Sequence, residues 1–219
     1  MENATKALEM AASVLIGVLL IGCIVYMYTQ VSAVKKIEQD STRTEQASDF
    51  NKNFEAYNRD DLYGSDLFSL ANQIENYNIK ESDAKDYGRI DMKVNVKNKP
   101  IGAVDFTRDT YNAEDLRDAY NSLANKIREL ENITTHGYGK NNNKKSVSYW
   151  ANFGTGTRLE QQFAQECGKS APNKLIDDVK KYTTYLGEQK DMARKTFKCT
   201  KMEYYSNTGR VKYMEFEEI

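Results

Sequence analysis

The sequence is poor in the residues that build metal sites and in those that disrupt regular structure. It contains one His, three Cys, two Pro and 12 Gly among 219 residues. A structural zinc site takes four Cys or His ligands, so all four such side chains of this chain would have to meet at one point. Collagen-like chains and Pro/Gly-rich disordered chains need far more Pro and Gly. These shortages argue against a metalloprotein and against a fibrous or low-complexity chain.

An excess of positive charge is also missing. Lys and Arg number 31 against 32 Asp and Glu. Before residue 35 the only charged side chains are Glu2, Lys6 and Glu9, so the remainder of the chain carries equal numbers of both signs. A nucleic-acid-binding surface needs a concentration of Lys and Arg that neutralises phosphates. We therefore expect no nucleic-acid partner.

Groups that could support catalysis are scattered. The single His, His136, stands in the polar stretch 136–145, where we expect a solvent-facing side chain rather than a general base in a pocket. The glycine turns at 137–139 and 154–156 lack the spacing of phosphate-binding loops. Adjacent acids such as those at 60–61 point to different faces of a helix. The sequence thus predicts no catalytic residue, no cofactor and no metal site, and a chain that is not an enzyme.

The most informative feature is one long apolar run. No charged residue occurs in the 25 positions 10–34, and the densest part, 10–28, holds 19 residues. As an α-helix this part is about 28 Å long, close to the ~30 Å hydrocarbon core of a bilayer. A buried helix of a soluble protein would normally show a polar stripe, which this run lacks. We predict a short N-terminal segment, 1–9, followed by a transmembrane helix over 10–34.

Processing and orientation stay open at this level. Residues 31–33 (Val-Ser-Ala) satisfy the small-residue rule for signal-peptide cleavage, so removal of 1–33 is the alternative to a retained anchor. Lys35, Lys36 and Arg43 favour a cytoplasmic C-terminal part by the positive-inside rule, but large domains often cross the membrane regardless of charge. We expect a single-pass protein of the cell membrane whose C-terminal domain is extracytoplasmic.

After the run, the pattern is that of an α+β protein. Apolar residues recur at helical spacing through 35–62, which predicts an amphipathic helical stalk that continues the transmembrane helix and stops before Gly64. A soluble domain over 63–219 follows. Its periodicity predicts helices at 66–77, 112–131 and 157–167, a helix or an extended segment at 174–185, and strands at 89–96 and 147–150. Residues 197–205 and 211–216 flank a turn-rich insert and predict a C-terminal antiparallel hairpin.

The cysteines bear on the compartment. Cys23 lies in the apolar run, and Cys167 and Cys199 are the two that remain in the soluble part. A disulfide between them would close a loop worth about 3–4 kcal/mol of stability. Disulfides persist outside the cytoplasm, so this bond would favour an extracytoplasmic domain. The alternative is two unrelated buried thiols. We predict the disulfide.

The apolar run also contains small residues that allow close helix–helix contact. Ser13 and Gly17 are four positions apart and Gly22 follows, a composition that lets two membrane helices approach. Glu9 precedes them, where the dipole of a helix favours an acid near its N-terminus.

An N-terminal helix that is apolar first and amphipathic afterwards, followed by a C-terminal antiparallel sheet, resembles a type IV pilin. Residues 1–34 and the segment 50–78 (FNKNFEAYNRDDLYGSDLFSLANQIENYN) also resemble pilin-like single-pass membrane proteins of Firmicutes that accompany tight-adherence (Tad) assembly machinery. The resemblance covers about a third of the chain. It implies a non-enzymatic structural or assembly subunit of a type IV/Tad-like surface or secretion system.

The resemblance also implies a role for Glu9. In pilins, a Glu at the fifth position of the mature helix neutralises the terminal amine of a neighbouring subunit, and cleavage after Ala4 would place Glu9 there. The residues 1–4 lack the basic side chain of a pilin leader, and Lys6 departs from the family pattern. The implied partners are membrane lipid, further copies of the chain and membrane assembly proteins. The alternative is a membrane-tethered extracytoplasmic binding or sensor module.

Overall fold

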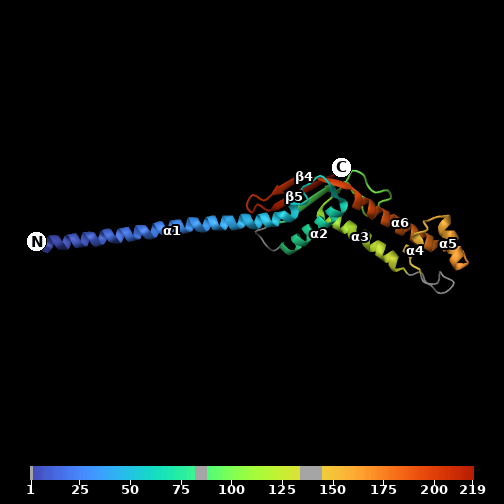
Figure 1. Cartoon of the computed structure of the whole chain (residues 1–219), viewed down its shortest axis with the longest axis horizontal. Coiled ribbons are helices and arrows are strands. Elements are labelled where there is room, and N and C mark those ends of the chain that lie inside the picture. The colour runs from blue at the N-terminus through green and yellow to red at the C-terminus, as the bar shows by residue number, and fades with distance from the viewer. Residues whose placement is uncertain (1, 82–87, 134–144) are drawn as a thin grey trace. The chain divides into compact units, whose positions relative to one another are not determined.

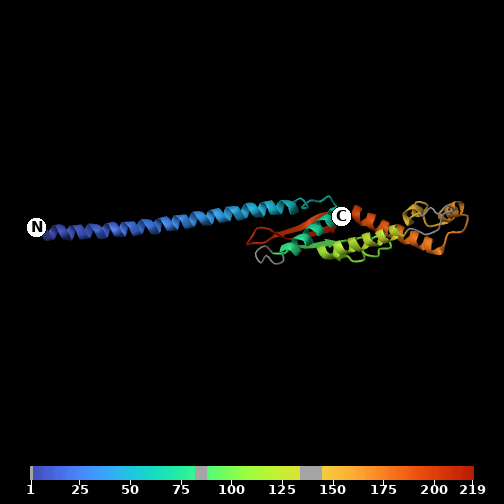
Figure 2. The same ribbon diagram turned by 90° about the horizontal axis from the view of Figure 1, so that it is seen from below.

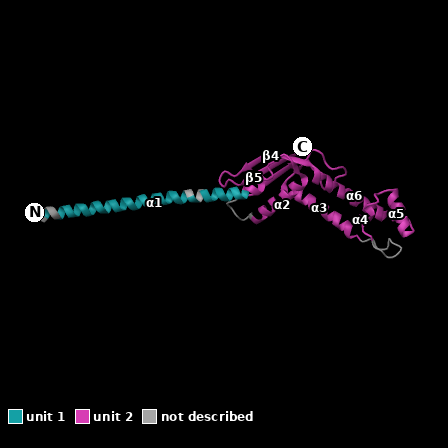
Figure 3. Cartoon of the chain, in the orientation of Figure 1, with its two compact units in different colours: residues 1–50 teal, residues 51–219 magenta. Residues whose placement is uncertain are grey.

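The computed structural model describes residues 2–81, 88–133 and 145–219 (Figure 1). The chain divides into two compact units, residues 1–50 and residues 51–219 (Figure 3). The fold is mixed α+β, with a long N-terminal helix and a small, mainly antiparallel sheet. The fold class predicted from the sequence is therefore confirmed at this level.

Helix α1, Glu2–Glu55, is one uninterrupted helix of 54 residues. No Pro occurs in this stretch, so no backbone donor is missing and nothing forces a kink. The predicted transmembrane and stalk segments are thus parts of the same helix. Its end comes earlier than the predicted residue 62, because the N–H groups of Tyr57 and Asn58 turn back to the carbonyls of Phe54 and Glu55.

The prediction that Gly64 stops α1 is wrong, because Gly64 begins helix α2, Gly64–Glu81. Gly64 has no room for a side chain, because a Cβ atom there would collide with the backbone carbonyl of Met192. The absence of a side chain lets α2 start directly against helix α6, Asn173–Arg194.

The sheet has the order β1-β4-β5-β2-β3. Its strands are β1 (Leu62–Tyr63), β2 (Asp91–Asn95), β3 (Thr110–Tyr111), β4 (Thr196–Tyr204) and β5 (Val211–Glu218). The predicted C-terminal hairpin is confirmed, since β4 and β5 pair in antiparallel fashion. β2 pairs with β5 in parallel, and the two-residue strands β1 and β3 pair antiparallel with their neighbours at the two edges.

One face of this sheet is buried and the other is polar. Met92 and Val94 of β2 stand beside Met214 and Phe216 of β5, and all four are buried. Helices α2 and α3 (Ala113–Asn132) contact the sheet and α6 packs against both helices, as Figures 1 and 2 show. On the opposite face Glu215 accepts hydrogen bonds from Lys93 and Asn95. This division is usual for antiparallel sheets, which tolerate water on one side.

The last turn of α1 belongs to the second unit and is fixed to the hairpin. The Asn51 side chain donates to the carbonyl of Gly209 at 2.8 Å and accepts from the N–H of Val211 at 2.9 Å. Phe54, one turn further on, is 2% exposed. The end of the long helix is therefore fixed to the β4–β5 turn by the two hydrogen bonds of Asn51.

The region between α3 and α6 corrects one prediction. Residues 147–150, predicted as a strand, form helix α4, Val147–Ala151, because the Ser146 hydroxyl accepts from the Tyr149 N–H and caps it. Helix α5, Thr157–Cys167, has the predicted bounds. Residues 174–185 are helical, within α6, so the extended alternative is wrong.

Candidate functional site

The N-terminal part of α1 is apolar and uncovered. It is long and apolar enough to cross a membrane, judged by length and composition, and none of its most apolar stretch is buried within the described chain. Sixteen large apolar side chains are each more than half exposed: Leu8, Met10, Val14, Leu15, Ile16, Val18, Leu19, Leu20, Ile21, Ile24, Val25, Tyr26, Met27, Tyr28, Val31 and Val34. Soluble monomers rarely expose a continuous patch of this kind, and such patches mark contact with membrane or protein.

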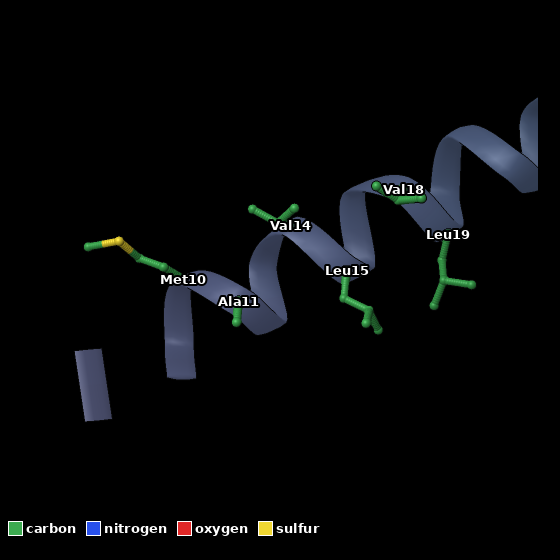
Figure 4. Close-up of a pocket in the computed structure, with 6 residues that line it drawn as sticks. All are labelled: Met10, Ala11, Val14, Leu15, Val18 and Leu19. Atoms are coloured by element: carbon green, nitrogen blue, oxygen red, sulfur yellow. The ribbon is translucent and has the colours of Figure 1, made fainter. Parts of the chain in front are cut away.

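The side chains of this segment form regular rows. Figure 4 shows Met10, Val14 and Val18 along one line of the helix surface, and a second line that contains Ala11, Leu15 and Leu19. A shallow apolar hollow lies between the two rows. Rows at four-residue spacing are the ridges that pack into the grooves of a second helix. The same surface equally suits the acyl chains of lipids.

The residues predicted for helix–helix assembly do not share one face. Glu9, Ser13 and Gly17 follow each other at four-residue intervals and so lie in one row of α1. Gly22 lies five residues after Gly17, about 140° further round the helix. A Cβ atom added at Gly17 or Gly22 would meet nothing within 4 Å, so both glycines are open to a neighbouring helix. Their role in assembly stays a prediction.

The predicted Cys167–Cys199 disulfide is not formed, since Cys23, Cys167 and Cys199 are all free thiols. Cys167 ends α5 and Cys199 lies on β4, and these two elements are at opposite ends of the 51–219 unit in Figures 1 and 2. A disulfide needs Cα atoms within about 7 Å of each other. Burial raises the pKa of both thiols, so neither is an activated thiolate. Free thiols give no support for an extracytoplasmic domain.

Two buried carboxylates have structural partners. Glu188 on α6 is 2% exposed and accepts hydrogen bonds from the backbone N–H groups of Val104, Asp105 and Phe106 at 2.8–2.9 Å. Glu218, which is also buried, accepts from Lys195 and from two backbone N–H groups at 97–98. Burial alone would raise the pKa of Glu218, but these donors outweigh it and hold the pKa below its usual value. Both carboxylates fasten loops to the core.

A third carboxylate organises the far end of the second unit. Glu166 on α5 accepts from the side chains of Gln162 and Tyr149 at 2.7 Å and from Lys145 at 2.9 Å. These hydrogen bonds lower the pKa of Glu166 to about 2. Within the described ranges, His, Cys, Asp and Glu side chains form no group of three or more that could hold a metal ion. His136 and the turn 137–139 lie outside the described residues.

An open groove of about 410 Å³ lies between α4 and α6. Among the residues that the structure describes, the lining consists of hydroxyl, amide and apolar groups without a Lys, Arg, Asp or Glu side chain: Ser146, Ser148, Tyr149, Ala151, Asn152, Tyr182, Thr183 and Leu186. Sequence reasoning missed this site. The lining comes from two segments about 30 positions apart, and residues 147–150 were predicted as a strand, which would spread their side chains over two faces.

Comparison of the chain with protein-family models, with curated proteins and with solved structures finds no match. Two features of the molecule bear on its function: the uncovered apolar segment of α1 and the α4–α6 groove.

Proposed function

We propose that this chain is a non-enzymatic, single-pass, membrane-anchored subunit of a pilin-like assembly of the type IV/Tad kind. The observation that supports it is the 54-residue helix α1, whose apolar first part is uncovered and whose last turn is fastened to a sheet. A helix built in this way would connect a membrane or fibre core to a folded domain.

The apolar segment needs a non-aqueous environment. Full burial of one large apolar side chain is worth about 1.5–3 kcal/mol, so sixteen exposed ones favour lipid or a bundle of helices by tens of kcal/mol. Residues 10–34 would span the bilayer, with Tyr26 and Tyr28 at the interface and Lys35 and Lys36 among the headgroups. The rest of α1 carries the chain about 30 Å beyond Val34.

Contacts between copies would use the same helix. The rows of Figure 4 offer ridges for a neighbouring α1, while Glu9, Ser13 and Gly17 form a further row of the helix. As in pilins, Glu9 would neutralise the terminal amine of a neighbouring subunit. Pulling force on α1 would pass to the β4–β5 hairpin through Asn51.

The test is whether the chain enters surface fibres in cells that carry its assembly machinery. We expect the chain in isolated fibres, and Glu9→Gln should reduce its amount there at least tenfold. Glu38→Gln, which removes an exposed carboxylate from the same helix beyond the apolar run, is the matched control and should assemble normally. Fibres that lack the wild-type chain would disprove the filament role but leave a membrane anchor.

A membrane-tethered extracytoplasmic binding or sensor module is the second candidate, and the α4–α6 groove is the observation that favours it. The two candidates differ in what they require of α1. An unrelated apolar helix in place of residues 1–34 should abolish assembly of a pilin-like subunit. A tethered binding module should keep its binding activity with that substitute anchor.

A further inference from the structure

We propose that the groove between α4 and α6 binds a neutral saccharide. This inference concerns residues of the 51–219 unit alone and gives a ligand class to the binding role described above as the second candidate. It does not depend on assembly through α1. A volume of about 410 Å³ falls within the range of small-molecule sites, about 300–1,000 Å³.

The lining matches the chemistry of sugar hydroxyls. Thr183, Ser146 and Ser148 supply hydroxyl groups, and Asn152 supplies an exposed amide that can both donate and accept. The Thr183 hydroxyl donates to the carbonyls of Val179 and Lys180, so its lone pairs remain for a donor from the ligand. A sugar hydroxyl also donates and accepts, and therefore fits a mixed set of this kind.

Two tyrosines of the lining are fixed in advance: Tyr149 is partly exposed, and Tyr182 is 7% exposed. The Tyr182 hydroxyl donates to Glu131 at 2.9 Å, and the Tyr149 hydroxyl donates to Glu166 at 2.7 Å. The Nζ of Lys145 lies 3.9 Å from the centroid of the Tyr149 ring. Because both rings are held without a ligand, binding costs little ordering of side chains. The C–H face of a pyranose can pack on the exposed part of the Tyr149 ring while its hydroxyls reach the polar groups.

Charge argues against ionic ligands. A bound anion would need a Lys or Arg in contact, and a bound cation would need a carboxylate, and the lining residues within 145–219 include neither. The nearby Lys145 and Glu166 bond to each other at 2.9 Å. Burial raises the pKa of Tyr182 above its usual value, so that phenol is neutral at physiological pH. An uncharged ligand avoids the large desolvation penalty of an unpaired charge.

The chain contains its own reporter for this site. Trp150 is the single Trp, it is 1% exposed, and it stands between Tyr149 and Ala151 of the lining. The experiment titrates the full chain, in a detergent without a sugar headgroup, with neutral di- to tetrasaccharides of glucose, galactose and N-acetylglucosamine. We expect a saturable change in Trp150 fluorescence with at least one of them. The affinity should be the same in low salt and at 0.5 M NaCl, because no charge pair forms.

Two threonines on adjacent positions of α6 give a matched pair of variants. Thr183 and Thr184 both donate to the Lys180 carbonyl at 2.9 Å, but only Thr183 lines the groove. Thr183→Val and Asn152→Ala should each weaken binding about tenfold, the usual effect of one lost hydrogen bond in a polar site. Thr184→Val should bind as the wild type does. Thermal unfolding of each variant verifies that the unit remains folded.

Three results would overturn the proposal. The first is no saturable change with any of these saccharides, either in fluorescence or in saturation-transfer NMR. The second is equal weakening by Thr183→Val and Thr184→Val. The third is a preference for sialylated or phosphorylated sugars that salt abolishes, since this would assign an anion site. Loss of fibre assembly with intact saccharide binding would count against the pilin-like role alone.

Discussion

The two units of this chain handle apolar and polar groups in opposite ways. In α1, sixteen large apolar side chains are exposed and no charged residue interrupts positions 10–34. In the 51–219 unit the apolar side chains form a core, and polar side chains such as Glu188 and Asn78 are buried with hydrogen-bond partners. The difference indicates that the two units are suited to different surroundings. Within the described residues, the second unit pairs nearly all of its buried side-chain polar atoms, with Trp150 Nε1 as the exception, whereas the first has almost none to pair and is suited to lipid or to other helices.

The largest expected effect comes from placing a charged side chain in the apolar run of the first unit, because charged residues are found in the second unit and not in this run. Ile21→Asp places a charge near the middle of the apolar run, which costs about 3 kcal/mol of membrane insertion free energy. We expect most of the variant to leave the membrane fraction on alkaline extraction. Thr42→Asp, on the exposed part of α1 beyond the run, is the control and should stay with the membrane. Equal extraction of both variants would show that the run is not held in lipid.

The second effect comes from removing a buried charge in the second unit. Glu188→Gln exchanges a carboxylate that accepts three backbone N–H groups for an amide that can accept fewer. The free energy of unfolding should fall by about 1–3 kcal/mol. Urea unfolding of the full chain, followed by Trp150 fluorescence, measures this change. Glu160→Gln alters an exposed carboxylate and should leave the midpoint unchanged.

The smallest effect is a pH dependence confined to the second unit. Hydrogen bonds from Gln162, Tyr149 and Lys145 lower the pKa of Glu166 to about 2, and Glu218 also has a lowered pKa. The unfolded chain then binds more protons than the folded one below about pH 4.5. The stability contributed by both groups is present above that pH and is lost as the pH falls toward 2. Glu166→Gln should flatten this part of a plot of Tm against pH, and an unchanged slope would contradict the assignment.

Local patterns in the sequence predicted much of the fold. The apolar run and its helical continuation gave α1, the stripe with Leu116 and Leu123 gave α3, and the alternation at 89–96 gave β2. These signals are carried by residues that are neighbours in sequence, so periodicity is enough to find them. β1 and β3 hold two residues each, too few for any periodic pattern.

Features that depend on distant segments were not predictable in this way. The parallel pairing of β2 with β5 joins residues more than 100 positions apart, and no local pattern encodes it. The separation of Cys167 from Cys199 depends on where α5 lies relative to the sheet, which their spacing in sequence cannot give. The groove requires both the helical form of 147–151 and its packing on α6.

The position of β5 has a consequence for how the chain is made. This strand lies between β4 and β2, yet residues 211–218 are synthesised after every other strand of the sheet. β2 therefore lacks its partner β5 throughout the synthesis of α3 to β4, and residues 10–34 have left the ribosome well before that. The sheet stays open during this interval. The domain therefore reaches its complete fold only after its last strand has been synthesised.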